Sequence, residues 1–144
     1  MEQADGECPI SVSHDMHYMH SHYGVHEAMK NLNKDQLLEF LSFRFRFLQE
    51  EVDEGFKAID EKDAEGYVDS IIDLAVVAVG TLDLLGVDFD RAWNSVLKAN
   101  LAKEVGIKAS RPNKLGLPDL IKKPGWTPPD HSGNHGIISD IFKD

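Results

Sequence analysis

Apolar side chains recur at helical spacing over residues 35–60, and this pattern constrains the fold more than any other feature of the chain. A residue at every third or fourth position falls on one side of an α-helix, because each residue turns the helix by about 100°. The pattern therefore predicts one long amphipathic helix that ends near Asp60, with glutamates on its opposite side. Its apolar residues are Leu37, Leu41, Phe45, Leu48, Val52, Phe56 and Ile59.

A second helix is predicted from about Asp63 to Leu85, with Gly86 directly after it. Its β-branched run could also form a strand, but the run is longer than most strands and continues from an acidic helical turn. The segment has almost no polar side, so we expect it to be buried on most sides. Its apolar residues are Ile71, Ile72, Leu74, Ala75, Val76, Val77, Ala78, Val79, Leu82, Leu84 and Leu85.

A short helix is predicted near the N-terminus. Ser11 or Ser13 can cap it, and it is expected to run through His20 until Gly24 ends it. Residues 25–33 can add one or two helical turns before the long helix begins.

A further helix is predicted to begin after Asp88, a suitable N-cap, and to run to about Glu104. Its inward-facing residues are expected to be Trp93, Val96, Leu97 and Leu101. Residues 105–144 hold five of the six prolines, which predicts a tail that wraps the surface. The expected fold is all-α: a single domain over residues 1–144, with a bundle of four to five helices over about 12–104 and a Pro/Gly-rich C-terminal tail.

The composition suits an acidic cytoplasmic protein. A chain of 144 residues with 42% hydrophobic content can bury a core, and it has no run of about 18 apolar residues that could span a membrane. The acidic start does not resemble a secretory signal, and the single cysteine, Cys8, cannot form an internal disulfide. The net charge of −10 argues against nucleic-acid binding and implies that an anionic substrate would need metal ions as intermediaries.

Five carboxylates form two clusters on the two long predicted helices. Glu50, Glu51 and Glu54 lie on the first helix, and Asp69 and Asp73 lie one turn apart on the second. If the helices pack face to face, several negative charges share a small volume, which favours a site for divalent cations.

The alternative is a solvated acidic face, which is the usual role of such residues. Asp73 speaks against it, because it opens the most apolar stretch of the chain, where an unpaired charge is costly. A salt bridge from Asp73 to Arg44 or Arg46 would also explain its position, and Asp83 is a candidate structural acid near the end of the same helix.

An ordered set of segments resembles the all-α nucleoside triphosphate pyrophosphohydrolases, the MazG-like group, and most closely its small phage-type and bacterial members. The segments are Glu50-Glu51-Val52-Asp53-Glu54, Asp69-Ser70-Ile71-Ile72-Asp73-Leu74 and Asn100-Leu101-Ala102-Lys103. Further likeness covers Asp15 through Gly24-Val25, Val79-Gly80-Thr81, and Lys123-Pro124-Gly125-Trp126 followed by Pro128-Pro129-Asp130.

The resemblance implies a homodimer or homotetramer that splits an NTP or dNTP into the nucleoside monophosphate and pyrophosphate. It carries over metal binding to Glu51, Glu54 and Asp73, and activation of the attacking water to Glu50. The second motif of the family is usually ExxD, and here Ser70 stands three residues before Asp73. Asp69 can point to the same face and is the candidate replacement ligand.

Oxygen ligands favour Mg²⁺, with Mn²⁺ as a substitute, over Zn²⁺. Asn100 and Lys103 are candidate phosphate contacts, although Lys103 is also a plausible solvated lysine at a helix C-terminus. Arg111, with Lys114, Lys122 and Lys123, could close the tail over the phosphates, with plain surface charge as the alternative for most of the four. His20, Tyr23 and Trp126 are candidate nucleobase contacts, with packing as the alternative role.

Histidines 14, 17, 20, 22 and 26 cluster near the N-terminus, but their spacing does not place three on one face, so a zinc site is not favoured. A di-iron bundle would need a Glu-x-x-His motif, which the chain lacks. Two further alternatives are a non-catalytic acidic module that binds a basic partner and a phosphoribosyl-ATP pyrophosphohydrolase-like activity. The base and sugar preference stay open, with a deoxyguanosine nucleotide as the first to test.

Overall fold

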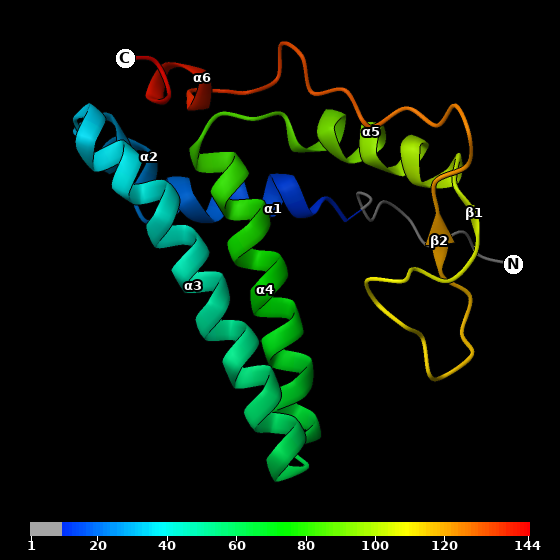
Figure 1. The fold of residues 1–144 in the computed structure, drawn as a ribbon. Helices are drawn as coiled ribbons and strands as arrows, with labels where there is room; N and C mark the ends of the chain where they lie inside the picture. The colour runs from blue at the N-terminus through cyan, green and yellow to red at the C-terminus, as the bar shows by residue number, and fades with distance from the viewer. Residues whose placement is uncertain (1–9) are drawn as a thin grey trace, which may run out of the picture.

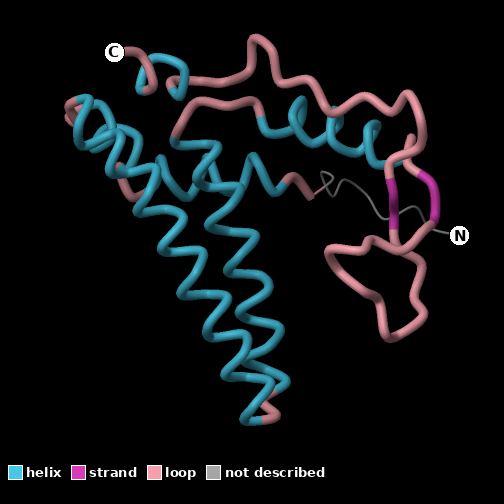
Figure 2. The backbone as a smooth tube through the Cα atoms, in the orientation of Figure 1, coloured by secondary structure: helices cyan, strands magenta, loops and turns pink. Residues whose placement is uncertain are grey.

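A computed structural model describes residues 10–144; the acidic start and Cys8 lie outside this range. The chain forms six helices and one two-stranded sheet in that range, which confirms the all-α prediction (Figures 1 and 2). The elements follow the order α1 (Val12–His22), α2 (Val25–Lys30), α3 (Lys34–Glu61), α4 (Ala64–Leu84), α5 (Phe89–Leu101), β1 (Glu104–Val105), β2 (Leu120–Ile121) and α6 (Ile138–Ile141).

The two long helices α3 and α4 form an antiparallel hairpin that dominates the molecule (Figure 1). Asn33 begins α3 with a capping box, since its side chain accepts from Gln36 N while the Gln36 side chain accepts from Asn33 N. The helix ends at Lys62, whose φ of 55° reverses the chain, and the Asp63 carboxylate caps α4 by accepting from Gly66 N. The predicted bounds of both helices are confirmed within a residue or two.

The helix α1 packs across α4, and two side chains of α1 lie against Gly80. A Cβ at position 80 would lie 2.9 Å from Met16 Cε and 3.1 Å from His20 Cε1, so a larger residue here would require these side chains to shift. Of the two candidate caps, Ser11 is the one that begins α1, since its side chain accepts from His14 N. Gly24 turns the chain into α2 with a φ of 70°.

The C-terminal part is more ordered than the predicted tail. The helix α5 ends at Leu101 rather than near Glu104, because Glu104 already pairs with Ile121 in the antiparallel sheet of β1 and β2. Farther along, Asn134 fixes the chain to α5 by accepting from Asp88 N at 2.8 Å and donating to Asp88 O at 2.9 Å.

Two expectations about burial were wrong for the single chain. The helix α4 is exposed along one side of its first half, where Tyr67, Val68, Ile71 and Ile72 face solvent, because within one chain only α3 packs against this half. The apolar residues of α5 are also exposed rather than inward-facing: Trp93, Val96, Leu97 and Leu101.

No single helix in residues 10–144 is long and apolar enough to cross a membrane; α4 and α5 pass such a test only together, as a pair bent by 119°.

Candidate active site

A cavity of about 330 Å³ lies where α1, α3 and α4 meet. Each helix contributes to its wall: Met16, Met19 and His20 from α1; Arg44, Phe47 and Glu51 from α3; Asp73, Val76 and Val77 from α4. Two of the predicted metal ligands, Glu51 and Asp73, thus face one another across the helix hairpin. This volume is at the lower end of the range for small-molecule sites in proteins.

Glu51 is the most unusual residue of this cavity. Its side chain is buried, with 8% of the residue exposed, and its Oε2 atom has no hydrogen-bond partner. Burial raises the pKa of this carboxyl, and the nearby carboxylates of Glu54, Asp73 and Glu50 raise it further. An ionised Glu51 is therefore unfavourable unless a cation neutralises it, and a divalent cation fits this arrangement.

The two acids that flank Glu51 in the predicted cluster lie on the solvent side of the site. Glu50 and Glu54 are exposed, whereas Glu51 between them points inward to Asp73. All donors are carboxylate oxygens, so the set formed by Glu51, Glu54 and Asp73 fits a hard cation such as Mg²⁺ or Mn²⁺ better than Zn²⁺.

Asp69 does not join this group within one chain. Its side chain is exposed and outside the cavity wall, as is that of Glu54, but unlike Glu54 it is not among the carboxylates that raise the pKa of Glu51. The position that faces α3 is Ser70, which is 2% exposed and donates its hydroxyl hydrogen to Tyr67 O at 2.9 Å. Ser70 packs against Gly55, so a larger side chain at position 70 would need the helices to separate. The role of Asp69 as a ligand stays a prediction, and its position speaks against it.

Arg44 is a site residue that the sequence analysis considered only as a partner for Asp73. It lines the cavity, its Nε donates to Thr81 Oγ1 at 2.8 Å, and its Nη2 donates to Val77 O at 3.2 Å. Its guanidinium also lies over the rings of Phe40 and Phe47, with 5.5 Å to the Phe47 centroid. Burial lowers the pKa of Arg44, but an arginine stays charged at neutral pH.

The alternative salt bridges for Asp73 are not found among the described residues. Arg44 is bound to α4 by the bonds above, and Arg46 pairs with Glu39 instead. Asp83 does have a structural environment, since His17 and His20 both bond to its carboxylate. A cation is thus the better explanation for the acids in the cavity.

The predicted substrate contacts divide into two regions. His20 lines the cavity, while Tyr23 is 75% exposed and packs edge-on against His22, outside the cavity wall. The others lie on α5 and in the C-terminal part, which leads away from the hairpin (Figure 1): Asn100, Lys103, Arg111 and Trp126.

Those C-terminal residues already have partners in the chain. Trp126 Nε1 donates to Ala99 O at 2.7 Å, and the amino groups of Lys103 and Lys122 lie 5.2 and 5.0 Å from the Trp126 ring centroid. Arg111 donates to both carboxylate oxygens of Asp119 at 2.9 Å. Their roles toward a substrate stay predictions.

Comparison with known protein families decides the assignment. The profile of the phosphoribosyl-ATP pyrophosphohydrolase (PRA-PH) family matches residues 25–100, more than half of the chain. The chain belongs to this family. The match runs from the start of α2 to the end of α5 and includes Glu51, Glu54 and Asp73. No curated protein matches the chain.

Membership of the PRA-PH family confirms the expected superfamily, because these enzymes belong with the MazG-like all-α pyrophosphohydrolases. The protein is accordingly a nucleotide pyrophosphohydrolase. The matched range supplies the carboxylates and the cationic side chain of the cavity at Glu51, while the α1 part of its wall precedes that range.

Proposed function

We propose that the protein hydrolyses a nucleoside triphosphate to the nucleoside monophosphate and pyrophosphate, with a deoxynucleotide as the preferred substrate. The observation that carries this proposal is the buried Glu51 carboxylate, unpartnered at Oε2 and close to further acids in a cavity that also holds Arg44. This combination suits Mg²⁺-bound phosphates better than it suits a structural core.

Glu51, Glu54 and Asp73 would hold the Mg²⁺, and Mn²⁺ is expected to substitute for it. Such a cation would neutralise phosphate charge and would lower the pKa of a coordinated water. Glu50 is the proposed general base: it lies beside Glu51 on the exposed side of the cluster, where water has access. The oxygen of water attacks one of the two phosphorus atoms on either side of the oxygen that bridges the α and β phosphates, and a proton of that water moves to the Glu50 carboxylate. The bond from the attacked phosphorus to the bridging oxygen breaks, which gives the monophosphate and pyrophosphate.

Arg44 and the apolar wall give the rest of the cavity its proposed role. The Arg44 guanidinium is oriented by Thr81 and by the Val77 carbonyl, so it can present its remaining N–H groups to a phosphate oxygen. Phe47 and His20 offer flat ring surfaces to a nucleobase in the same cavity.

A second candidate substrate is phosphoribosyl-ATP, which the family description supports. It carries a triphosphate that can react in the same way, but it is larger than a dNTP by a phosphoribosyl group. We propose dGTP as the first nucleotide to test and a cytoplasmic setting, which the nucleotide substrate and the single cysteine support.

A substrate panel tests the proposal. Chelator-treated protein is given each dNTP, each NTP and phosphoribosyl-ATP, with and without Mg²⁺ or Mn²⁺, and pyrophosphate and orthophosphate are measured separately. The proposal expects metal-dependent pyrophosphate release with the highest kcat/KM for a dNTP. A preference for phosphoribosyl-ATP would support the second candidate, and orthophosphate as the first product would contradict both.

A further inference from the structure

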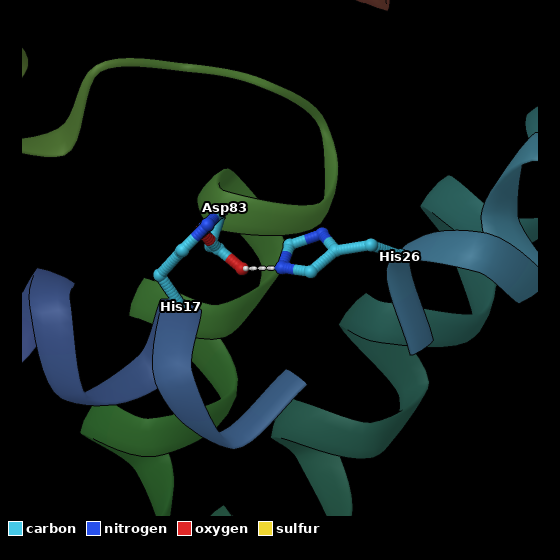
Figure 3. Close-up of side chains that lie close together, drawn as sticks. All are labelled: His17, His26 and Asp83. Carbon is cyan, nitrogen blue, oxygen red and sulfur yellow. Dashed lines mark hydrogen bonds and ion pairs between the residues drawn. The ribbon is translucent and has the colours of Figure 1, made fainter. Parts of the chain in front are cut away.

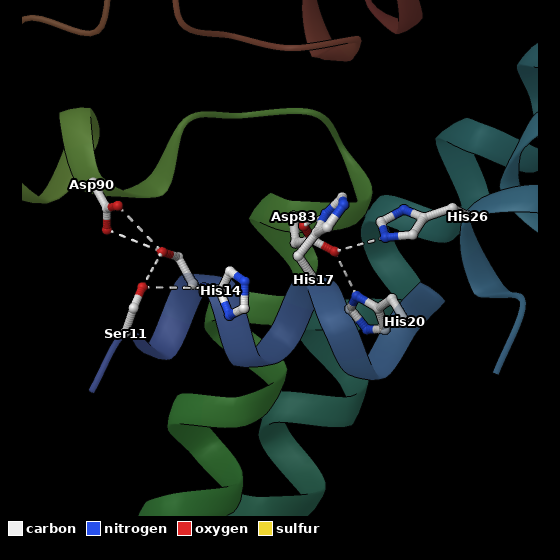
Figure 4. A network of polar contacts seen from close by, with 8 residues as sticks. Ser11, His14, His17, His20, His26, Asp83 and Asp90 are labelled. Atoms are coloured by element: carbon white, nitrogen blue, oxygen red, sulfur yellow. Dashed lines mark hydrogen bonds and ion pairs between the residues drawn. The ribbon is translucent and has the colours of Figure 1, made fainter. Parts of the chain in front are cut away.

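Three histidines converge on one carboxylate at a place separate from the proposed Mg²⁺ ligands. His17 and His20 come from α1, His26 comes from α2, and Asp83 lies near the end of α4 (Figure 4). The shortest contacts join His20 Nδ1 to Asp83 Oδ2 at 2.6 Å and His17 Nδ1 to Asp83 Oδ1 at 2.8 Å. Three helices thus meet at this group, although 66 residues separate His17 from Asp83 in the chain.

Hydrogen bonding alone leaves one member of the group unexplained. His26 Nε2 lies 3.4 Å from Asp83 Oδ2, but it is buried and has no hydrogen-bond partner. Its ring lies beside that of His17, with 4.5 Å between the centroids. Two imidazolium ions so close would repel one another, whereas two neutral imidazoles can share a cation.

The donor atoms already have a spacing that suits a small cation. His17, His26 and Asp83 each offer one ligand atom, and these atoms lie within 4.8 Å of one another (Figure 3). In a tetrahedral site with bonds of about 2.0–2.1 Å, neighbouring ligand atoms lie about 3.3 Å apart. His17 Nδ1 lies 2.8 Å from Asp83 Oδ1, and His26 Nε2 lies 3.4 Å from Asp83 Oδ2, so both imidazoles already flank the carboxylate that the cation would share with them.

We propose that His17, His26 and Asp83 bind one Zn²⁺ or a similar transition-metal ion at a site distinct from the carboxylate cavity. Two imidazoles and one carboxylate favour Zn²⁺ over Mg²⁺, which prefers oxygen ligands. Three protein ligands leave a fourth position for water, and His17 is exposed enough to admit it.

His20 is a positioning residue of this site. Its Nδ1 donates to Asp83 Oδ2 and holds the carboxylate toward the other two ligands, as outer partners of metal ligands commonly do. His20 also lines the cavity at Glu51. The cation would therefore fasten α1 and α2 to α4 and fix the α1 wall of the active site.

Direct measurement of bound metal tests the proposal without using activity. The chelator-treated full chain is equilibrated with Zn²⁺ in excess Mg²⁺ and passed through a desalting column, and its metal content is measured by mass spectrometry. We expect one Zn²⁺ per chain. Alanine at His17 or at His26 should weaken the affinity by at least about tenfold, with helicity unchanged by circular dichroism.

Two control variants make the assignment specific. His22→Ala removes an exposed histidine on the same helix, and Glu51→Gln removes a carboxylate of the cavity; both should still bind one Zn²⁺. The proposal is overturned if the wild-type protein binds no Zn²⁺, if His17→Ala and His26→Ala bind it as well as wild type, or if Glu51→Gln abolishes binding. Since His17 is mostly exposed, His17→Ala keeps the test valid even if His26→Ala fails to fold.

Discussion

At the scale of single residues, Glu51 combines burial with proximity to other acids. Its pKa is raised in the folded chain, so its ionisation costs folding free energy in the absence of metal. Below the pKa of an unfolded glutamate the group is protonated in both states and costs nothing. As the pH rises through the folded pKa, stability is lost, and this loss is the energy that a bound cation recovers.

The first prediction concerns Glu51→Gln. The variant should lose activity by about a hundred- to a thousandfold, yet its metal-free form should be as stable as wild type at acidic pH and more stable at neutral pH. Thermal unfolding with a chelator, recorded across that range, checks the sign. A variant that is less stable than wild type at neutral pH would show that Glu51 is a structural partner rather than a metal ligand.

The second prediction separates Asp69 from the acids of the cavity. Because Asp69 is exposed and Ser70 occupies the position facing α3, Asp69→Asn should change the Mg²⁺ concentration for half-maximal activity by less than about threefold. Asp73→Asn, the matched change one turn later, should abolish measurable activity or raise that concentration by more than about tenfold. A large increase of this concentration in Asp69→Asn would show instead that Asp69 binds the metal in place of the motif glutamate that the chain lacks.

At the scale of helices, the α3–α4 hairpin depends on small residues where the two helices touch. A Cβ built at Gly55 would lie 3.1 Å from Ser70 Oγ, and Ser70 is fixed by its bond to Tyr67 O. This contact lies one turn from Glu51 on α3 and one turn from Asp73 on α4, so it sets the separation of the two ligands.

A double-mutant cycle provides the third prediction. Gly55→Ala should destabilise the protein despite the better helix propensity of alanine, and adding Ser70→Ala should restore about 1 kcal/mol by removing the crowded hydroxyl. Urea unfolding of the four proteins gives the coupling energy. Additive effects would mean that the helices separate freely at this point.

The long helices were predictable because capping residues in the sequence mark where each helix begins. Asn33, Asp63 and Asp88 cap helices at their predicted starts, and helical spacing fixes the stretches between them. The burial of Glu51 beside Asp73 did not follow from the spacing alone, because the spacing placed the glutamates opposite the apolar residues of this helix. The choice between Asp69 and Ser70 did not follow from it either, because the two positions differ by about 100° around a helix and only packing against Gly55 selects one.

Contacts between segments far apart in the sequence could not be predicted from the sequence pattern. No spacing rule links His17 and His26 to Asp83, and the cavity role of Arg44 depends on the crossing of α1 at Gly80. The short pairing of β1 with β2 joins two-residue strands, which leave too little periodicity to detect.

At the scale of the whole molecule, the exposed apolar side chains indicate that one chain is an incomplete unit. Ile72 is 57% exposed and lies with Ile71 and Val68 on the same part of α4, while Trp93 and Leu101 are exposed on α5. Contiguous apolar surface on such helices is typical of protein interfaces. We propose that a second copy of the chain covers α4 and that the assembly is a homodimer or homotetramer.

The fourth prediction tests this assembly. Ile72→Glu should shift the protein toward monomer in size-exclusion chromatography with light scattering, because a buried charge would be unpaired in the interface. Leu115→Glu changes an equally apolar but 81% exposed residue of the loop between β1 and β2, and should leave the mass unchanged. A wild-type chain that is monomeric at all concentrations would contradict the proposed assembly.

The central claim is that the carboxylate cluster around Glu51 supports cleavage between the α and β phosphates of a nucleotide. Phosphorus NMR of the reaction mixture tests this claim most directly. With dGTP and Mg²⁺, the account predicts that the monophosphate and pyrophosphate appear together from the first time point, and that Glu51→Gln forms neither at a comparable rate. Early appearance of the diphosphate with orthophosphate, or full activity in Glu51→Gln, would contradict it.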